Sequence, residues 1–230
     1  MLLEIAGLVI DVKNKYKYFE MVSRDFITSG KAPDFTIEVP EDVLKEAISK
    51  NPEYSDDYIE ALEIYRIICK KMLKYDAMLM HCAAISVDNE AYLFTAVSGT
   101  GKTTHISLWK KKFKEKCIVV NGDKPILRLI DGKFYACGTP WRGKENYGEN
   151  IMVPIKAICI LERGEENSIK KIAPYDAIST VITQTLRTND MDEMDKMLSL
   201  TDKLLEKVPF YRLKCNMNDD AADVSYNGMN

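Results

Sequence analysis

An eight-residue glycine-containing string, residues 96–103, restricts the fold of this 230-residue chain more than any other feature. It reads Ala-Val-Ser-Gly-Thr-Gly-Lys-Thr and matches the Walker A phosphate-binding pattern, with alanine in place of the first glycine. A Tyr-Leu-Phe run before it predicts a strand, and Ile106, Trp109 and Phe113 follow at the spacing of one helix face. Such an arrangement suits an anion, because backbone N–H groups and the helix dipole converge on it.

The residue types in this loop predict how a nucleotide is held. Lys102 is expected to reach the β and γ phosphates, and the Thr103 hydroxyl to bind Mg²⁺. ATP or GTP and Mg²⁺ are therefore the cofactors that we expect. The alternative is a glycine-rich turn that caps an ordinary helix, and the Lys-Thr pair at the right place argues against it. The candidate nucleotide-binding residues are Ser98, Gly99, Thr100, Gly101, Lys102, Thr103 and Thr104.

A candidate metal ligand follows the next apolar segment, residues 117–120. This segment predicts a buried strand, and Asp123 is the acid that follows its end. A phosphate loop needs a carboxylate across the cleft to hold the metal, commonly at the end of a neighbouring strand. We therefore expect Asp123 to be both a metal ligand and a catalytic residue. In the alternative interpretation, Asp123 only shapes the turn before Pro125.

A polar loop at residues 138–150 concentrates glycines, two cations, two acids and two aromatic residues. Arg142 or Lys144 is a candidate for neutralising charge on a transferred phosphoryl group. Long polar loops beside a phosphate site commonly grasp substrates. The alternative is a surface loop whose charges are solvated and whose Trp141 fills the core.

The two histidines allow different interpretations. His81 follows an apolar run, where a lone histidine is more often a hydrogen-bonded core residue than a catalyst. His105 lies at the start of the helix after the phosphate loop. Its partner there is either the nucleotide base or solvent.

Turn signals beyond residue 77 predict a sheet built from hairpins. Asp88-Asn89 and Asp131-Gly132 are each flanked by apolar runs, as in tight β-hairpins. We therefore expect an α/β fold with a mixed sheet, unlike the parallel sheet of a Ras-like or RecA-like protein. The three expected hairpins join residues 78–87 to 91–96, 126–130 to 133–137, and 157–161 to 168–172. The expected C-terminal elements are helices near 175–187 and 191–207, a strand at 210–215 and a short closing helix.

The first third of the chain predicts a smaller unit. Acids follow the first residue of each of its two predicted helices, at the positive end of the helix dipole. The expected elements are strands at 2–12 and 35–39 and helices opening at Pro40 and Ser55, the second ending near Tyr75. We expect residues 1–77 to form a small α/β region packed on the core. Residues 78–230 are expected to form a nucleotide-binding, kinase-like domain.

Composition excludes several classes of partner. A formal net charge of −3 and a pI of about 5.6 provide no basic field for a nucleic acid backbone. The N-terminus shows no basic leader, and no apolar run approaches the length of a membrane span. The six cysteines stand far apart, mostly inside apolar runs, which indicates reduced thiols in a cytoplasmic protein. The expected partners are a nucleotide and a hydroxyl acceptor, and neither nucleic acid nor a membrane is expected. The sequence leaves open whether the chain forms a homo-oligomer.

Two families share parts of this pattern. Residues 98–104, Ser-Gly-Thr-Gly-Lys-Thr-Thr, resemble the kinase-1 loop of phosphoenolpyruvate carboxykinases. The order of Met80-His81, a hairpin, the loop, Val-Asn-Gly-Asp and an Arg-Gly pair resembles the catalytic domain of HPr kinase/phosphorylases. The resemblance spans residues 78–161, about a third of the chain. It implies a mixed sheet around the loop and an ATP-dependent kinase that phosphorylates a hydroxyl of a small molecule, peptide or protein.

The chain also departs from both families. HPr kinases carry an Asp-Asp pair where Gly122 precedes Asp123 here, so either Asp123 alone serves metal and acceptor, or Glu145 or Glu149 contributes. Arg142 falls where HPr kinases carry a catalytic arginine. The chain is too short for a carboxykinase, and its first third does not resemble the HPr kinase N-terminal domain, so neither decarboxylation nor HPr is carried over. A nucleotide hydrolase or switch, and a nucleotide-sensing regulator, remain alternatives.

Overall fold

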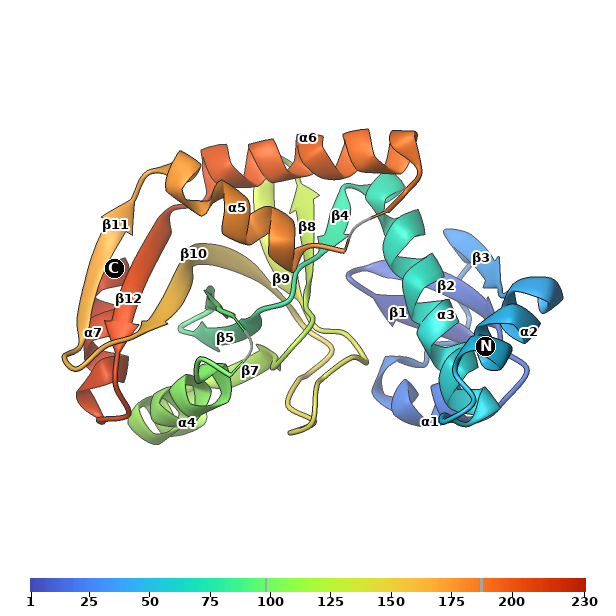
Figure 1. Cartoon of the computed structure of the whole chain (residues 1–230), viewed down its shortest axis with the longest axis horizontal. Coiled ribbons are helices and arrows are strands. Elements are labelled where there is room, and N and C mark those ends of the chain that lie inside the picture. The colour runs from blue at the N-terminus through green and yellow to red at the C-terminus, as the bar shows by residue number, and fades with distance from the viewer. Residues whose placement is uncertain (98, 187) are drawn as a thin grey trace.

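The computed structural model describes residues 1–97, 99–186 and 188–230 (Figure 1). Ser98, a predicted loop residue, and Arg187, the predicted end of a helix, lie outside the described residues. In Figure 1 a small N-terminal unit lies beside a larger unit built around a long curved sheet. No helix within the described ranges combines the length and the apolar character that crossing a membrane requires.

The N-terminal unit contains a three-stranded sheet in the order β1-β2-β3, covered by helices. Its elements are β1 (Leu2–Ile5), β2 (Leu8–Lys13), α1 (Tyr18–Val22), η1 (Arg24–Phe26), β3 (Phe35–Glu38), α2 (Glu41–Lys50), α3 (Asp56–Met72) and η2 (Leu73–Tyr75). The expected single strand at 2–12 is wrong. Ala6 and Gly7 have φ angles of 54° and 72°, and this left-handed pair turns the run into the β1–β2 hairpin.

The larger unit contains a nine-stranded sheet. Its elements are β4 (Ala77–Leu79), β5 (Ala83–Val87), β6 (Glu90–Thr95), α4 (Lys102–Phe113), η3 (Lys114–Lys116), β7 (Ile118–Asn121), β8 (Ile126–Ile130), β9 (Lys133–Cys137), β10 (Met152–Arg163), β11 (Ser168–Ile172), α5 (Pro174–Gln184), α6 (Met191–Lys207), β12 (Phe210–Cys215) and α7 (Asp220–Met229). Seven strands follow the order β4-β8-β9-β10-β6-β5-β7, while β12 pairs with β10 and β11. Because β6 runs antiparallel to β5 and parallel to β10, the sheet is mixed, as predicted.

Two of the three predicted hairpins are confirmed. β5 and β6 are joined by Asp88 and Asn89, with φ angles of 51° and 62°. β8 and β9 are joined by Asp131 and Gly132, with φ angles of 47° and 78°. Both pairs occupy the left-handed region that a two-residue hairpin turn of this type requires. The turn residues therefore determine these pairings locally.

The third expected hairpin is wrong. β12 lies between β10 and β11, parallel to the first and antiparallel to the second. Its Phe210 and Leu213 are buried, whereas both lysines of β11 are exposed. An apolar strand thus takes the inner position and a lysine-rich strand takes the edge, where lysines hinder pairing with other chains.

The expected strand at 78–87 is interrupted. Its first part, β4, pairs with β8, and its second part, β5, pairs with β6 and β7. Between them, Met80 forms a single bridge to Thr185, and His81 follows at the bend. The break carries the chain from one side of the sheet to the other and leaves His81 beside the end of β6.

Two apolar cores cover the faces of the large sheet. In β6, Leu93 packs in the core that includes α5 and α6, whereas Tyr92 and Phe94 pack in the core that includes α4 and α7. This alternation is the period of two that a strand imposes. Figure 1 shows α5 and α6 above the sheet, with α4 below it and α7 at the far left. The strand that leads into the phosphate loop is therefore packed on both faces, which fixes where the loop begins.

The small unit packs on the large sheet through a third core. Residues of β1, β2 and α3 join Ala77, Ile126 and Cys137 in one apolar cluster. Arg128 adds a polar contact, because its Nη1 donates to the Ala6 carbonyl at 2.7 Å. All six cysteines are free thiols. The contact area between the units lies next to the loop at residues 138–150.

Candidate active site

The phosphate loop leaves β6 and enters α4 through two glycines in the left-handed region. Gly99 and Gly101 have φ angles of 79° and 114°, although a Cβ at either position would meet no atom within 4 Å. Glycine is therefore favoured at both positions by the left-handed backbone conformation, because a side chain there would not clash with neighbouring atoms. No side chain caps the first turn of α4, and that turn contains no acid. Its free N–H groups leave an N-terminus suited to an anion.

Two cations reach this loop. The Lys102 Nζ donates to the Ala96 carbonyl at 3.3 Å, so the lysine folds back over the loop. The Arg163 Nη2 donates to the Gly99 carbonyl at 2.7 Å. Arg163 was not among the predicted site residues. It lies at the end of β10, three residues beyond Ile160, which pairs with Thr95 at the end of β6.

A cavity of about 450 Å³ opens on one side of the loop. It lies between the start of α4 and the ends of β10 and β12. Met217 at this cavity is 78% exposed, so an apolar side chain stands where a ligand would enter. The lining residues are Gly99, Thr100, Gly101, Thr104, His105, Arg163, Gly164, Cys215, Asn216 and Met217.

His105 has a different partner from either of those expected. Its side chain is only 2% exposed, and its Nε2 accepts from the Trp109 Nε1 at 3.1 Å and lies 3.2 Å from the Ser225 Oγ. The Phe94 ring packs edge-on at 4.6 Å. Burial lowers the pKa of His105 to about 4, so it is neutral at physiological pH. The expectation of a nucleotide base or solvent as its partner is wrong, because the α4–α7 contact encloses the ring.

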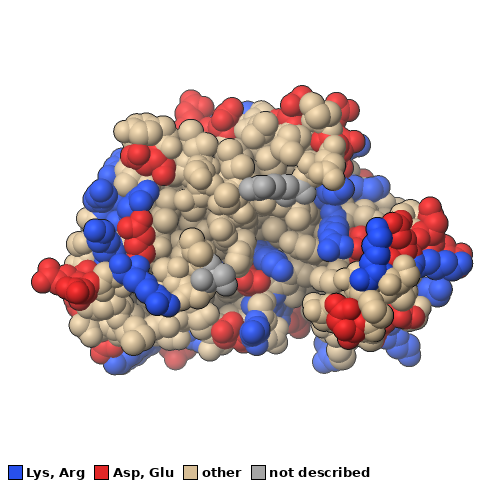
Figure 2. Space-filling model, in the orientation of Figure 1, with Lys and Arg blue, Asp and Glu red and all other residues tan. Residues whose placement is uncertain are grey.

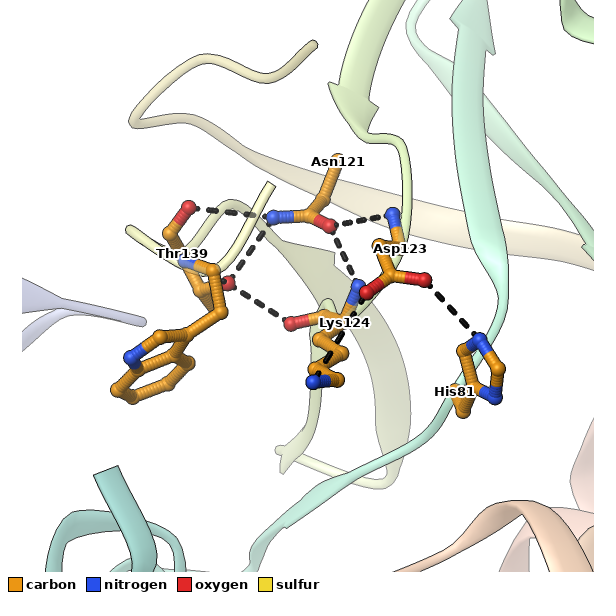
Figure 3. A network of polar contacts seen from close by, with 6 residues as sticks. His81, Asn121, Asp123, Lys124 and Thr139 are labelled. Carbon is orange, nitrogen blue, oxygen red and sulfur yellow. Dashed lines mark hydrogen bonds and ion pairs between the residues drawn. The ribbon is translucent and has the colours of Figure 1, made fainter. Parts of the chain in front are cut away.

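Asp123 and His81 form a hydrogen-bonded pair (Figure 3). The His81 Nε2 lies 3.0 Å from Asp123 Oδ1, and the Lys124 Nζ lies 3.9 Å from Oδ2. The hydrogen bond from His81 holds the pKa of Asp123 below its ordinary value, and the charges of Lys124 and Lys102 act in the same direction. Asp123 is therefore ionised, and it lies close enough to Lys102 for the lysine charge to lower its pKa.

The core interpretation of His81 is wrong. Its side chain is 36% exposed, and its backbone is fixed from two elements. The His81 N–H donates to the Gln184 carbonyl at 2.7 Å, and the Thr95 hydroxyl donates to the His81 carbonyl at 3.2 Å. Both the end of α5 and the last residue of β6 thus hold the bend that presents the imidazole to Asp123.

Asn121 shapes the turn that carries Asp123. It is fully buried, and its Oδ1 accepts from the N–H groups of Asp123 and Lys124 at 2.8 and 2.7 Å. Its Nδ2 donates to the carbonyl and hydroxyl oxygens of Thr139, and the Thr139 hydroxyl donates to the Lys124 carbonyl (Figure 3). Because Asn121 makes these turn contacts, the Asp123 carboxylate faces His81 instead. Sequence reasoning did not single out Asn121, since its partner is 18 residues away.

The loop at residues 138–150 folds over this turn. The Gly122 N–H donates to the Tyr147 carbonyl at 2.9 Å. Gly143 has a φ angle of 74°, and a Cβ there would lie 2.9 Å from the Asp123 Cβ. The Thr103 hydroxyl donates to Glu145 Oε1 at 3.3 Å, which joins this loop to the start of α4. The same loop therefore contacts Asp123 through Gly143 and Thr103 through Glu145.

The remaining charged residues of the loop point elsewhere or into solvent. The Arg142 Nη2 lies 2.7 Å from Asp25 Oδ2, and its guanidinium lies over the Phe26 ring at 5.4 Å. Lys144 and Glu149 are exposed. The structure thus brings Glu145, and not Glu149, to the predicted metal ligand Thr103. Trp141 is partly buried and packs edge-on against Tyr65 at 4.6 Å.

The oxygen atoms of Thr103, Asp123 and Glu145 suit Mg²⁺ bound together with substrate phosphates and water, and they do not form a complete set of protein ligands for a metal. Within the described residues, no three His, Cys, Asp or Glu side chains group together as a metal site. Mg²⁺ commonly keeps several waters and binds one or two carboxylates together with substrate phosphates. The Thr103 hydroxyl and the Asp123 and Glu145 carboxylates match that description.

Charge on the face drawn in Figure 2 is mixed. Basic and acidic side chains of the described residues alternate around a mainly uncharged centre, and no continuous basic area covers this face. A scan of protein-family models and a search of curated proteins give no match to this chain. Among solved structures, the chain is similar to the Hpr(Ser) kinase/phosphatase from Coxiella burnetii, with 8% identity, a TM-score of 0.38, and coverage of 65% of this chain and 94% of that chain. At this level of similarity, function has to be inferred from the site itself.

Proposed function

We propose that this protein is a Mg²⁺-dependent phosphotransferase that moves the γ-phosphoryl group of ATP or GTP to a hydroxyl of a small molecule, peptide or protein. One observation carries the proposal. Lys102, at the open N-terminus of α4, is close enough to Asp123 for its charge to lower the pKa of that carboxyl, and Asp123 pairs with His81. An anion-binding helix start facing an ionised carboxylate is the arrangement that phosphoryl transfer requires.

We expect the nucleotide to bind in one orientation, with its phosphates at the start of α4 and its nucleoside in the adjacent cavity. Its phosphates would lie over residues 99–103, where N–H groups and Lys102 meet them. Its nucleoside would occupy the cavity of about 450 Å³, which opens beside the same glycines. The Met217 side chain would pack against the base. Arg163 would hold the loop through its hydrogen bond to the Gly99 carbonyl. The γ-phosphate then points away from the cavity, toward Asp123.

Thr103, Asp123 and Glu145 would hold Mg²⁺, which neutralises charge on the transferred phosphoryl oxygens when it is bound. Glu145 supplies the second acid that the Gly122-Asp123 sequence lacks. Its contact with the Thr103 hydroxyl places its carboxylate beside the phosphate loop without an adjacent aspartate. The second acid thus comes from a different loop.

Asp123 would orient the acceptor hydroxyl. Because the hydrogen bond from His81 lowers its pKa, Asp123 stays ionised and is a weak base. A weak base is sufficient, since phosphoryl transfer through a loose transition state depends mainly on positioning and charge stabilisation. We therefore assign orientation of the hydroxyl to Asp123, and orientation of the Asp123 carboxylate to His81.

The two loop cations have unequal access to the phosphates. Arg142 reaches them only after leaving Asp25 and Phe26. Lys144 is exposed two residues further along the same loop. Arg142 is therefore a catalytic residue only if it exchanges Asp25 for phosphate, whereas an exposed Lys144 would not have to leave a buried position to reach the transferred group.

The division of the chain belongs to the same proposal. Residues 1–77 would form a small α/β region and residues 78–230 the kinase domain, with the boundary at the start of β4. Limited proteolysis that releases a fragment beginning near residue 77 would support this boundary. Cleavage only at other positions would argue against it.

Nucleotide turnover with and without acceptors tests the proposed activity. Purified protein is incubated with Mg·ATP or Mg·GTP and a panel of hydroxyl compounds that includes serine peptides, threonine peptides, sugars and polyols. Diphosphate formation that depends on one acceptor supports the phosphotransferase. Slow turnover without any acceptor would indicate a hydrolase, and tight binding without turnover would indicate a nucleotide sensor.

A further inference from the structure

The predicted catalytic loop is attached to the N-terminal unit by a nearly buried arginine. The Arg142 side chain is only 10% exposed, and its Nη2 lies 2.7 Å from the carboxylate of Asp25 in η1. The Phe26 ring covers the guanidinium at 5.4 Å. A buried guanidinium depends on its carboxylate partner, because an unpaired buried charge is strongly unfavourable. Asp25 therefore determines where Arg142 lies.

The far end of the same loop rests on the same corner of the small unit. The Asn150 Nδ2 donates to the Glu4 carbonyl at 3.2 Å and to the Asp25 carbonyl at 3.4 Å. Asp25 thus contacts the loop near both ends, through its side chain at Arg142 and its backbone at Asn150. A segment held at two points has few conformations left between them.

Between these two attachment points, the loop makes its contacts with the proposed active site. Gly143, next to Arg142, lies against the Asp123 side chain. Two residues further on, Glu145 accepts from the Thr103 hydroxyl. A shift of Arg142 would therefore be transmitted directly to both carboxylates of the proposed metal site.

We propose that Asp25 is a positioning residue for catalysis, and that the N-terminal unit acts as the platform that holds the catalytic loop against Asp123 and Thr103. The role of Arg142 is then to connect the loop to this platform. The inference rests on the proposed function for its catalytic part. The placement of the loop, in contrast, is measurable without any turnover.

Tryptophan quenching measures this placement directly. Trp141 precedes Arg142 and is partly buried, whereas Trp109 is fully buried, so acrylamide quenching reports mainly on Trp141. We expect D25N to increase the quenching constant about twofold or more, because the loop leaves its platform, and D25E to stay near the wild type. The matched control is Glu41→Gln, which removes another exposed carboxylate of the same unit. Glu41 forms an ion pair with Lys45, away from the loop.

Turnover tests the catalytic part. With an acceptor found, D25N should lower kcat roughly 10- to 100-fold, the scale of a displaced catalytic group, while the KM for nucleotide stays within about twofold. D25E should recover most of kcat, and Glu41→Gln should match the wild type. D25S serves as a second variant, and unchanged far-ultraviolet circular dichroism with cooperative thermal unfolding checks that both are folded.

The outcomes separate this inference from the proposed function. Wild-type quenching in D25N and D25S would overturn the platform, whether or not the protein is a kinase. Increased quenching with unchanged kcat would overturn the catalytic role of Asp25. If no acceptor supports turnover in the wild type, the proposed function fails, and the quenching result still decides whether Asp25 places the loop.

Discussion

The two loops that border the candidate site are built in different ways. The phosphate loop is held mainly by contacts within a few residues, such as Thr100 N–H to the Val97 carbonyl and Lys102 Nζ to the Ala96 carbonyl, together with one distant contact from Arg163 to the Gly99 carbonyl. The loop at residues 138–150 is held by partners more than a hundred residues away, through Arg142 to Asp25 and Asn150 to Glu4. The conformation of the phosphate loop is therefore set mainly by nearby residues, whereas the position of the loop at residues 138–150 depends on contacts with the N-terminal unit.

This difference assigns separate tasks to the two loops. A local glycine turn with an open helix N-terminus binds phosphate wherever the strand and helix are formed. The placement of Glu145 beside Thr103 instead depends on the packing between two units of the molecule. Changes in the phosphate loop should therefore abolish binding of the phosphates, whereas changes around the second loop should lower turnover and leave binding intact.

The largest effect is expected from Lys102→Ala. Turnover should fall below detection, because the ammonium neutralises the β and γ phosphates. The fold should persist, since among the described residues Lys102 makes one hydrogen bond, to the Ala96 carbonyl of its own loop. Thermal unfolding with and without Mg·ATP measures this, and the wild type should gain stability through linkage while the variant gains little.

Lys111→Ala is the matched control for that experiment. Lys111 lies on the same helix and is exposed, with an ion pair to Asp219. It should keep both turnover and the nucleotide-dependent gain in melting temperature. Equal gains in the wild type and in Lys102→Ala would show that the phosphate loop has been wrongly assigned.

The next largest effect is expected at the two acids. Asp123→Asn should lower turnover by roughly three orders of magnitude or more, because the acceptor loses its orienting anion. Glu145→Gln should cost roughly two orders, since it supports the metal from the second loop. Nucleotide affinity measured without Mg²⁺ should be unchanged in both. Steady-state turnover with a known acceptor and Mg²⁺-free titration calorimetry give the two values.

Glu149→Gln is the control for the acids, because Glu149 is an exposed acid on the same loop. Near-wild-type turnover is expected for it. If all three variants turn over normally, the phosphotransferase mechanism is excluded and a nucleotide sensor becomes the better description. A large loss for Glu149→Gln alone would instead require the loop to adopt another conformation with nucleotide bound.

A pH effect on stability is expected from the helix that follows the phosphate loop. Burial lowers the pKa of His105 from 6.5 to about 4, so between these values the unfolded chain binds a proton that the folded chain does not. The stability contribution is therefore complete above pH 6.5 and is lost as the pH falls toward 4. The loss is on the order of 3 kcal/mol, at about 1.4 kcal/mol per pKa unit.

Urea unfolding at several pH values between 7.5 and 4 checks this for the wild type and His105→Gln. The variant removes the titrating group, so its stability should fall less steeply with decreasing pH, whatever its absolute value. Identical slopes for the two proteins would mean that His105 titrates normally and is not enclosed by α4 and α7.

The same contrast explains how much could be predicted from the sequence. The mixed sheet, the glycine turn between β6 and α4, and the turns at Asp88-Asn89 and Asp131-Gly132 depend on neighbouring residues, and sequence patterns carry that information. Asp123 was predicted as a site residue because it follows a buried strand, and that role stays a prediction. Each of these predictions needed only short-range dihedral and burial preferences.

Most of the features that were missed depend on long-range contacts, whereas the turn at Ala6-Gly7 that divides β1 from β2 is local. The insertion of β12 between β10 and β11 is decided by competition among strands for the buried position. The pairing of His81 with Asp123 requires that β4 and β5 separate around His81. Arg142 was expected at the phosphates because the sequence does not show that Asp25 lies beside it. Such partners are separated by up to 117 residues, and no local preference encodes them.

The smallest effect, and the sharpest test of the comparison, is expected from Thr139→Val. Thr139 is buried at the start of the second loop, and its hydroxyl accepts from Asn121 Nδ2 at 2.9 Å and donates to the Lys124 carbonyl at 2.8 Å. Valine keeps the shape but leaves a buried carbonyl without that donor, at a cost of about 1–2 kcal/mol in unfolding free energy. Turnover should also fall, by roughly tenfold, because the turn that carries Asp123 loses one of its supports.

Thr201→Val separates this local effect from the general cost of replacing a buried threonine. Thr201 is 2% exposed in α6, and its hydroxyl donates to the Met197 carbonyl within the same helix. That variant should lose less stability and keep full turnover. The Thr139 hydroxyl connects the second loop, through Asn121 and Lys124, to the turn that carries Asp123, whereas the Thr201 hydroxyl contacts the Met197 carbonyl and the Met78 sulfur, away from the site. Equal turnover in both variants would therefore mean that the second loop does not position Asp123.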